Sequence, residues 1–245
     1  MRKLVLILGA KSDIAKATAI NFAKDGFDLL LVGRDVKSEL KEFCQIITRK
    51  FEQKVFFYDL DILDSDAIKK FLVEIEIIPD GIISFVGLLG VQKRATNDPQ
   101  YAQVILKSNF NAILPIFDYF ANKYENQSEK FIIGVSSVSG MRGRKSNYYY
   151  GSAKAAFSAY LSGLRNRLSA SKVNVMTVIP GYVDTKMTKN LHLSKWLTVS
   201  PEYVGEKIFI AYRKKKDILY VPKIWEMIMI LIRLIPEGIF KRLNL

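Results

Sequence analysis

The segment "KLVLILGAKSDIAKATA", Lys3 to Ala19, decides the fold class. A short apolar run of strand character turns tightly at Gly9 into an alanine-rich helical pattern that begins near Ser12. Such a turn presents the free N–H groups of a helix to an anion, as in dinucleotide-binding α/β folds. The residues predicted to meet a cofactor pyrophosphate are Gly9, Lys11, Ser12, Asp13 and Ile14.

This turn departs from the glycine-rich fingerprint, because Asp13 and Ala15 occupy the places of its second and third glycines. Ala15 is small enough for the helix to pack closely on the strand. A carboxylate at position 13 would repel a pyrophosphate, unless its side chain turns back to cap the helix and Lys11 offsets its charge.

Further apolar runs of strand character alternate with helical patterns along the chain. The runs are "KLVLIL", "DLLLV", "KVFFY", "GIISFV", "KFIIGVS", "KVNVMTVI" and "DILYV", and the helices are expected to begin near Ser12, Ser38, Asp64, Asp98, Asn147 and Pro201. No repeat or linker divides the chain. This pattern predicts an α/β fold, a single doubly wound Rossmann-type domain with a seven-stranded parallel sheet over residues 1–222. An apolar C-terminal helical extension follows at 223–245.

Composition narrows the class of protein. With 245 residues and 49% hydrophobic residues, the chain suits one large globular domain. Cys44 is the only cysteine and His192 the only histidine, so we expect no disulfide framework and no metal site, and a cytoplasmic location. The apolar run Leu4 to Leu8 is too short for a signal peptide and is interpreted as a strand.

The formal charge of +13 indicates an anionic ligand or surface. Residues 186–245 hold 12 Lys or Arg against 5 Asp or Glu, so the last quarter of the chain carries much of this excess. No helix-turn-helix, zinc finger or RNA-binding signature accompanies the charge, and we expect no nucleic-acid partner.

The end of the second predicted strand bears on the choice of cofactor. In dinucleotide folds an acid at this place selects NAD, and an arginine accepts the 2'-phosphate of NADP. Gly33 and Arg34 stand here, whereas Asp28 lies at the amino end of the strand, away from the crevice. The expected cofactor is therefore NADP(H), and the alternative is that Arg34 is an ordinary solvated charge.

Three consecutive tyrosines occur in "NYYYGSAKAAF", Asn147 to Phe157, and only Tyr150 stands four residues before Lys154, on the same helix face. Lowering a phenol pKa from ~10 to ~7 takes roughly 4 kcal/mol, which one ammonium ~4 Å away supplies at an effective dielectric of ~20. By itself the pair is also consistent with an aromatic stripe on an amphipathic helix.

Four further motifs stand at characteristic spacings. "SSVSG" places Ser137 thirteen residues before Tyr150, "KSNFNA" contains Asn109, "DLD" spans Asp59 to Asp61, and "PGYVDTKM" begins at Pro180. With these motifs the chain resembles the short-chain dehydrogenase/reductase family over nearly its whole length.

The resemblance implies catalytic roles for four residues. Tyr150 would donate a proton to a substrate carbonyl and Ser137 would hydrogen-bond the developing oxyanion. Lys154 would lower the pKa of the tyrosine and bind the nicotinamide ribose, and Asn109 would support a water relay. The further cofactor contacts that the resemblance implies are Asp59, Leu60, Gly87, Pro180, Gly181, Val183 and Thr185.

One stretch departs from the family pattern, because "SFVGLLGVQ" after the fourth strand keeps only Gly87 of the usual N-N-A-G. This stretch, the phosphate loop and the C-terminus resemble a branch that contains decaprenylphosphoryl-2-keto-pentose reductases of cell-envelope polysaccharide pathways. That resemblance implies reduction of a keto group on a lipid-linked or nucleotide-linked sugar. The alternatives are a reductase of a soluble ketone or acyl thioester and a non-catalytic dinucleotide-binding protein.

The C-terminal segment is unusually apolar, with only Glu226 and Arg233 polar between Ile224 and Ile235. At ~1.5 Å per residue this helix reaches ~18 Å, short of the ~30 Å hydrocarbon core, so it is not expected to span a bilayer. It is expected either to lie peripherally at the inner face of the cell membrane, with Trp225 among the headgroups, or to be buried in a homo-oligomer. The loop after Pro180 is expected to shape substrate specificity, through residues that include Met187, His192 and Trp196.

Overall fold

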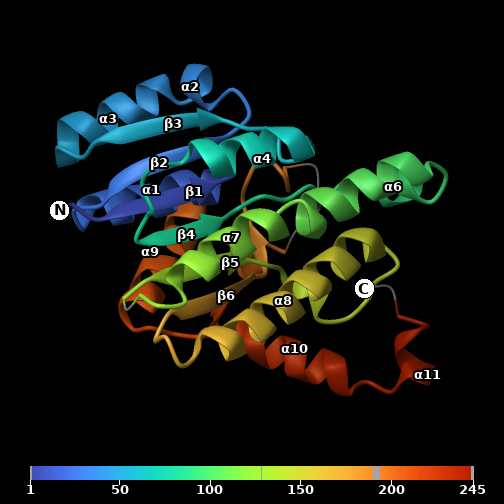
Figure 1. The fold of residues 1–245 in the computed structure, drawn as a ribbon. Coiled ribbons are helices and arrows are strands. Elements are labelled where there is room, and N and C mark those ends of the chain that lie inside the picture. Colours follow the sequence, from blue (N-terminus) through green and yellow to red (C-terminus); the bar gives the residue numbers. More distant parts are fainter. Residues whose placement is uncertain (1, 128, 190–193, 244–245) are drawn as a thin grey trace.

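A computed structural model describes residues 2–127, 129–189 and 194–243 and contains the predicted seven-stranded sheet (Figure 1). The strands are β1 (Leu4–Leu8), β2 (Asp28–Gly33), β3 (Val55–Asp59), β4 (Gly81–Ser84), β5 (Phe131–Val135), β6 (Asn174–Pro180) and β9 (Ile218–Val221). Their order is β3-β2-β1-β4-β5-β6-β9 and every neighbouring pair is parallel. The predicted fold class is confirmed, and each of the seven apolar runs forms one strand of this sheet.

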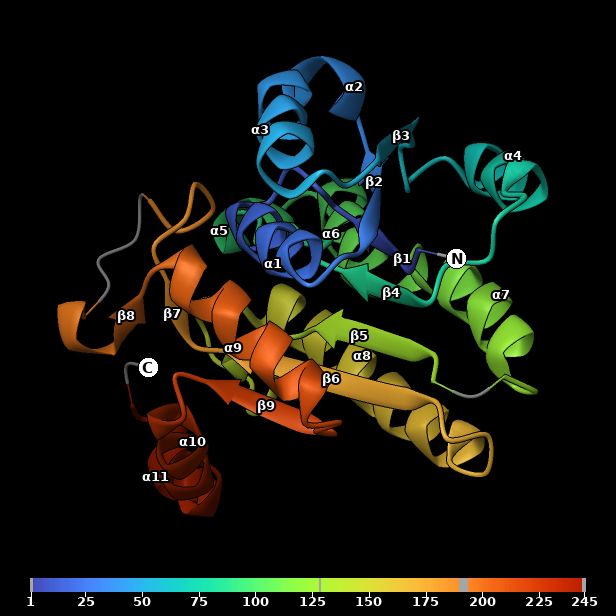
Figure 2. The same ribbon diagram turned by 90° about the vertical axis from the view of Figure 1, so that its left-hand side faces the viewer.

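Helices cover both faces of the sheet. One face packs against α1 (Asp13–Lys24), α3 (Lys41–Phe51) and α9 (Pro201–Arg213), and the other against α4 (Ser65–Glu74), α7 (Leu114–Tyr124) and α8 (Tyr148–Leu168). Figure 2 shows α1 and α9 on one side of the sheet and α7 and α8 on the other. Within β1, Val5 and Ile7 belong to the first core and Leu6 and Leu8 to the second. This alternation explains why the strand is apolar throughout, since both of its faces are buried.

Some of the helices begin at residues whose side chains satisfy free N–H groups. The Asp64 carboxylate accepts hydrogen bonds from the backbone at the start of α4, and the Asp98 carboxylate does so at the start of α6 (Pro99–Leu106). The start expected near Ser38 is replaced by a short α2 (Val36–Glu39) before α3.

The segment after Asp98 is not one continuous helix. Short α5 (Gln92–Ala95) precedes α6, and a π-helical turn at Lys107–Asn111 separates α6 from α7. Two consecutive residues of the turn, Ser108 and Asn109, are buried. Turns of the π type are frequent at functional sites. The sequence pattern did not predict this turn.

The C-terminal segment forms α10 (Ile224–Leu234) and α11 (Glu237–Phe240), which lie beyond the β9 edge of the sheet (Figure 2). The inward face of α10 places Trp225 and Met229 in a cluster with Val138 and Ile179. The prediction that Trp225 sits among lipid headgroups is wrong, because the indole is only 3% exposed. Within the described ranges, no helix combines the length and apolarity needed to cross a membrane.

Candidate active site

A cavity of about 490 Å³ lies at the carboxyl ends of the parallel strands, where a doubly wound sheet binds its ligands. Among the predicted site residues, those that line it are Gly9, Lys11, Ser12, Asp13, Ile14, Arg34, Leu60, Gly87, Ser137, Tyr150, Lys154, Pro180, Gly181, Val183 and Thr185. Asp59 and Asn109 are not among its lining residues. The cavity extends from the turn after β2 to the turn after β6.

The turn after β1 has the shape of a phosphate cradle. Gly9 adopts a φ of +78°, and a Cβ atom there would stand 2.9 Å from the backbone nitrogen of Val86, so only glycine fits. Ser12 ends the turn in extended conformation, and its side chain makes no capping bond to α1. The first N–H groups of this twelve-residue helix therefore face the cavity without a side-chain cap, as an anion site requires.

The structure shows how Asp13 is accommodated, and the expected capping role is wrong. The Asp13 carboxylate accepts a hydrogen bond of 3.0 Å from the backbone N–H of Lys186. Lys11 does not offset its charge directly, because its ammonium lies 2.5 Å from the Glu39 carboxylate, which lowers the pKa of Glu39. Asp13 thus links the phosphate turn to the segment after β7 (Tyr182–Val183), 173 residues away in the chain.

Three of the four predicted catalytic side chains meet at the other end of the cavity. Ser137 follows β5 in extended backbone and is 9% exposed, as is Tyr150 in the first turn of α8, and Lys154 is 3% exposed. The Lys154 ammonium donates to the carbonyls of Val86 (3.2 Å) and Val135 (3.0 Å). Val135 ends β5 and Val86 stands two residues after the neighbouring β4, so the carboxyl ends of two paired strands fix the position of the amine.

Burial controls the acidity of both groups. Desolvation raises the pKa of Tyr150 to about 12, and the neighbouring Ser137 hydroxyl opposes this rise. Desolvation also lowers the pKa of Lys154 to about 7. The expectation that Lys154 lowers the pKa of the tyrosine does not hold in this arrangement, because the amine stands 5.8 Å from the centre of the Tyr150 ring and is itself shifted towards neutrality.

Asn109 lies behind the cavity wall instead of in it. Its side-chain amide donates to the carbonyls of Leu88 and Ile105, and its oxygen accepts from the N–H of Leu88 at 3.2 Å. The same oxygen is 3.2 Å from the place where a Cβ at Gly87 would stand. Asn109 therefore shapes the backbone of "GLLG" after β4, and glycine at 87 leaves room between that backbone and Lys154.

The opposite rim of the cavity carries Arg34 after β2. Its guanidinium lies 3.9 Å from the Asp61 carboxylate, and the two side chains are 67% and 44% exposed. Asp61 lines the cavity, whereas the predicted Asp59 instead accepts a hydrogen bond of 2.7 Å from the N–H of Val36. The Asp59 carboxylate therefore binds the first residue of α2, whereas Leu60 and Asp61 line the cavity.

The turn after β6 depends on a residue that the sequence did not reveal as part of the site. A Cβ at Gly181 would stand 1.8 Å from the Trp225 indole nitrogen, so the ring fills the space beside the glycine. The same indole packs edge-on against Tyr182, with ring centres 4.9 Å apart. Trp225 was interpreted only as a lipid-facing residue, because sequence spacing does not show which helix face meets a turn more than forty residues earlier.

The loop after Pro180 was expected to shape substrate specificity. Met187 lines the cavity and Trp196 does not, while His192 lies outside the described residues. Among the described residues, no group of three His, Cys, Asp or Glu side chains is placed to hold a metal ion.

Comparison with known proteins gives a family and a fold. The family model for short chain dehydrogenases matches residues 3–196. An uncharacterized oxidoreductase of Mycobacterium tuberculosis is 27% identical over 243 residues, with 98% of this chain and 96% of the relative covered. An NADP-dependent 3-hydroxy acid dehydrogenase of Schizosaccharomyces pombe is 27% identical over 241 residues, with 89% of each chain covered.

Solved structures agree on the fold. A short-chain dehydrogenase from Sphingobium yanoikuyae in complex with NADPH has a TM-score of 0.83 at 19% identity, covering 96% of this chain and 97% of its own. A 7beta-hydroxysteroid dehydrogenase has a TM-score of 0.86 at 18% identity, covering 99% and 96%.

Proposed function

The chain belongs to the short-chain dehydrogenase/reductase family and is an NAD(P)-dependent oxidoreductase, and from this premise we propose that it uses NADPH to reduce a keto group on a lipid-linked or nucleotide-linked sugar. The observation that carries the proposal is the convergence of Ser137, Tyr150 and Lys154 at one end of a cavity whose other end offers an anion cradle and Arg34.

The cavity fits a dinucleotide along its length. The Gly9 turn and the start of α1 would hold the pyrophosphate, Arg34 would pair with a 2'-phosphate, and the backbone of Pro180 to Val183 would lie on the nicotinamide side of the cavity. When bound, this cofactor supplies the hydride. A pair of exposed charges such as Arg34 and Asp61, 3.9 Å apart, is weak enough for the guanidinium to turn towards a phosphate.

The residues at the reaction end supply the proton and the oxyanion contact. Because the pKa of Tyr150 is about 12, its phenol is protonated at neutral pH and donates to the carbonyl oxygen. Ser137 donates a second hydrogen bond to the same oxygen as negative charge develops on it. Lys154 is held by the carbonyls of Val86 and Val135, with its amine 5.8 Å from the centre of the Tyr150 ring, so its charge, when it is protonated, stabilises the tyrosinate until water returns the proton.

The substrate end combines apolar and polar groups, which suits an amphiphile. Leu88, Leu89, Val104 and Met187 line it together with the polar side chains of Ser139 and Asn147. The runner-up is reduction of a soluble 3-keto acid or acyl thioester. It is favoured by the likeness to a protein named as an NADP-dependent 3-hydroxy acid dehydrogenase.

The test is NADPH oxidation by the purified protein with a lipid-phosphate-linked 2-keto-pentose and, separately, with soluble ketones and 3-keto acids. We expect turnover with the lipid-linked sugar and a loss of about 10²- to 10⁴-fold in Tyr150→Phe, because the proton donor is removed. Tyr148→Phe is the matched control, since this neighbouring ring is 40% exposed and lies outside the cavity. Full activity of Tyr150→Phe would refute the mechanism, and turnover confined to soluble 3-keto acids would select the runner-up.

A further inference from the structure

The outward face of α10 carries large apolar side chains that nothing in the described chain covers. They are Ile224 (52% exposed), Met227 (59%), Ile230 (49%), Leu231 (63%) and Leu234 (73%). Their spacing of three or four residues places most of them on one stripe of the helix. Contiguous exposed apolar surface of this kind marks an interaction site in a globular protein.

The helix cannot rotate to bury this stripe, because its inward face and its end are already held. Trp225 and Met229 fill the cluster beneath it, where the indole packs against Gly181 and Tyr182. Arg142, in the loop after Ser137, donates to the carbonyls of Ile232 and Ile235 at the end of the helix. The outward stripe is therefore a fixed feature of the fold.

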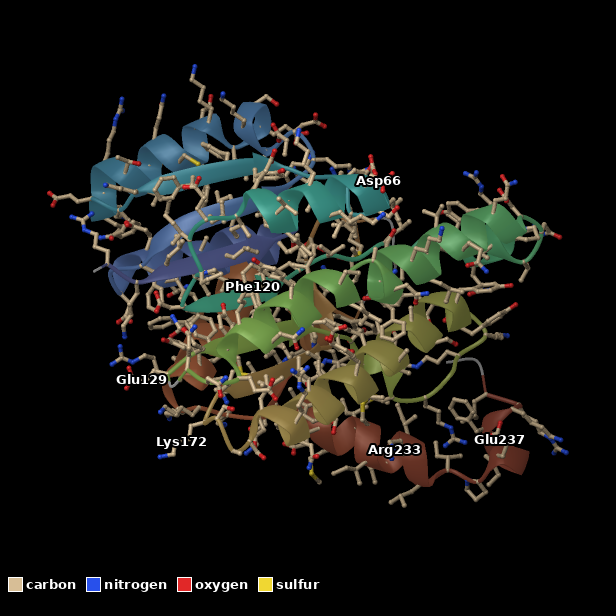
Figure 3. All side chains as sticks on the ribbon, viewed as in Figure 1. Asp66, Phe120, Glu129, Lys172, Arg233 and Glu237 are labelled. Atoms are coloured by element: carbon tan, nitrogen blue, oxygen red, sulfur yellow. The ribbon has the colours of Figure 1, made fainter. Side chains whose placement is uncertain are left out.

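Arg142 also fixes α11 relative to α10. Its guanidinium pairs with the Glu237 carboxylate at 3.0 Å and stands 3.7 Å from the centre of the Phe240 ring. Figure 3 shows Arg233 near the end of α10 and Glu237 on α11, with side chains of α10 projecting away from the sheet. Ile239 on α11 is 56% exposed and extends the apolar surface.

An exposed tryptophan adjoins, in the chain, a residue that packs beneath α10. Leu197 packs with the Trp225 and Met229 cluster, and Trp196, its neighbour in the chain, is 97% exposed. An indole is stable where apolar and polar surroundings meet, as in the headgroup region of a bilayer, and is costly to leave fully in water.

The charges around the stripe favour an anionic partner. Lys223 and Arg233 begin and end the helix, Lys241 and Arg242 follow α11, and all four are exposed. A two-fold dimer through this face would combine two copies of a net positive surface, in which these four basic residues stand with only Glu226 and Glu237, and this opposes association. An anionic lipid surface would instead attract them.

We propose that α10, α11 and Trp196 form a docking surface for anionic phospholipid membranes. The eleven residues of α10 extend about 16 Å, so the helix lies in the interface plane with its apolar stripe among the acyl chains and its basic residues among the headgroups. Through Trp225 and Gly181, this surface adjoins the cavity wall formed after β6. The proposal does not depend on the identity of the substrate.

The test is flotation of the full-length protein with vesicles of phosphatidylcholine alone and of phosphatidylcholine with phosphatidylglycerol. We expect binding to the mixed vesicles that weakens with added salt, and little binding to the neutral ones. Leu231→Glu should lower the vesicle affinity at least tenfold, because it places a carboxylate in the centre of the stripe. Val73→Glu makes a comparable change at an 85% exposed position on α4, outside the surface, and should bind as the parent does.

Two readouts separate membrane docking from the alternatives. The thermal unfolding temperature and the NADPH affinity of Leu231→Glu should match those of the parent protein. Such a match would show that the fold and the cofactor site are intact. A loss of vesicle binding would then be distinct from a failure of the proposed activity. Absence of binding to anionic vesicles would overturn the proposal. Light scattering that shows a stable dimer, converted to monomer by Leu231→Glu, would also overturn it and assign the stripe to a second copy of the chain.

Discussion

The two ends of the cavity are built in different ways. At the reaction end, Ser137, Tyr150 and Lys154 are each at most 9% exposed, and the lysine is held by two backbone carbonyls. At the other end, Arg34 and Asp61 are 67% and 44% exposed and stand 3.9 Å apart. Groups without solvent around them have strongly shifted pKa values and little freedom, whereas exposed ions are screened and mobile. Substitutions should therefore cost more at the reaction end than at the rim.

The largest loss of stability is expected for Gly181→Ala, where the buried end meets α10. The new methyl group would stand 1.8 Å from the Trp225 indole nitrogen, and that ring is only 3% exposed and has no room to move. We expect the free energy of unfolding to fall by about 3 kcal/mol, as for a severe overpacking change, with turnover reduced about 10²-fold. Urea unfolding and steady-state kinetics with NADPH measure the two effects.

Gly143→Ala is the control for this prediction, because a Cβ there meets nothing within 4 Å. The double variant Gly181→Ala with Trp225→Leu should recover part of the lost stability, since it removes the ring that the methyl group strikes. If Gly181→Ala proves as stable as Gly143→Ala, then the indole does not confine this turn.

The reaction end was also the part of the site that sequence predicted best. Ser137, Tyr150 and Lys154 are set by a strand end and one helix turn, which are local and have a fixed geometry. Asp13, Asp59 and Trp225 were interpreted wrongly for a common reason. Each contacts a residue far away in the chain, respectively Lys186, Val36 and Gly181. The periodicity of the sequence does not indicate such contacts.

A similar limit applies to the fold. The seven strands follow from apolar runs separated by helices, but their order does not, because this alternation does not say which strands lie side by side. The π-helical turn that buries Asn109 has no comparable signal, because one extra residue in a helix hardly changes an apolar pattern.

A gain in stability that depends on pH is expected from Lys154→Met. The pKa of Lys154 is lowered to about 7 in the folded protein, whereas an unfolded lysine titrates near ~10.4. Between these values the unfolded chain binds one more proton, so this residue makes stability rise with pH by about 1.4 kcal/mol per unit. The methionine variant should lack that contribution. Its free energy of unfolding should therefore exceed that of the parent most at pH ~7, and the difference should shrink towards pH ~10.

Urea unfolding of both proteins at several pH values within this window measures the difference in slope. The comparison uses slopes and not absolute stabilities, so a constant packing effect of methionine cancels. Parallel stability curves for the two proteins would show that Lys154 stays charged in the folded state and that its burial is compensated within the cavity.

The smallest effect is expected at the exposed rim. Arg34→Ser should weaken NADPH binding by roughly tenfold, which corresponds to ~1.4 kcal/mol, and leave NADH binding nearly unchanged, because only NADPH carries the 2'-phosphate that the guanidinium would contact. Lys37→Ser removes the same formal charge from α2 without changing a residue that lines the cavity, and it separates a direct contact from the general field of a basic protein. Fluorescence titration of both cofactors at two salt concentrations makes the comparison.

Equal weakening of NADPH binding in the two variants would mean that the rim attracts phosphate only through its net charge. A loss confined to Arg34→Ser would instead show that even a mobile, screened side chain discriminates between the two cofactors.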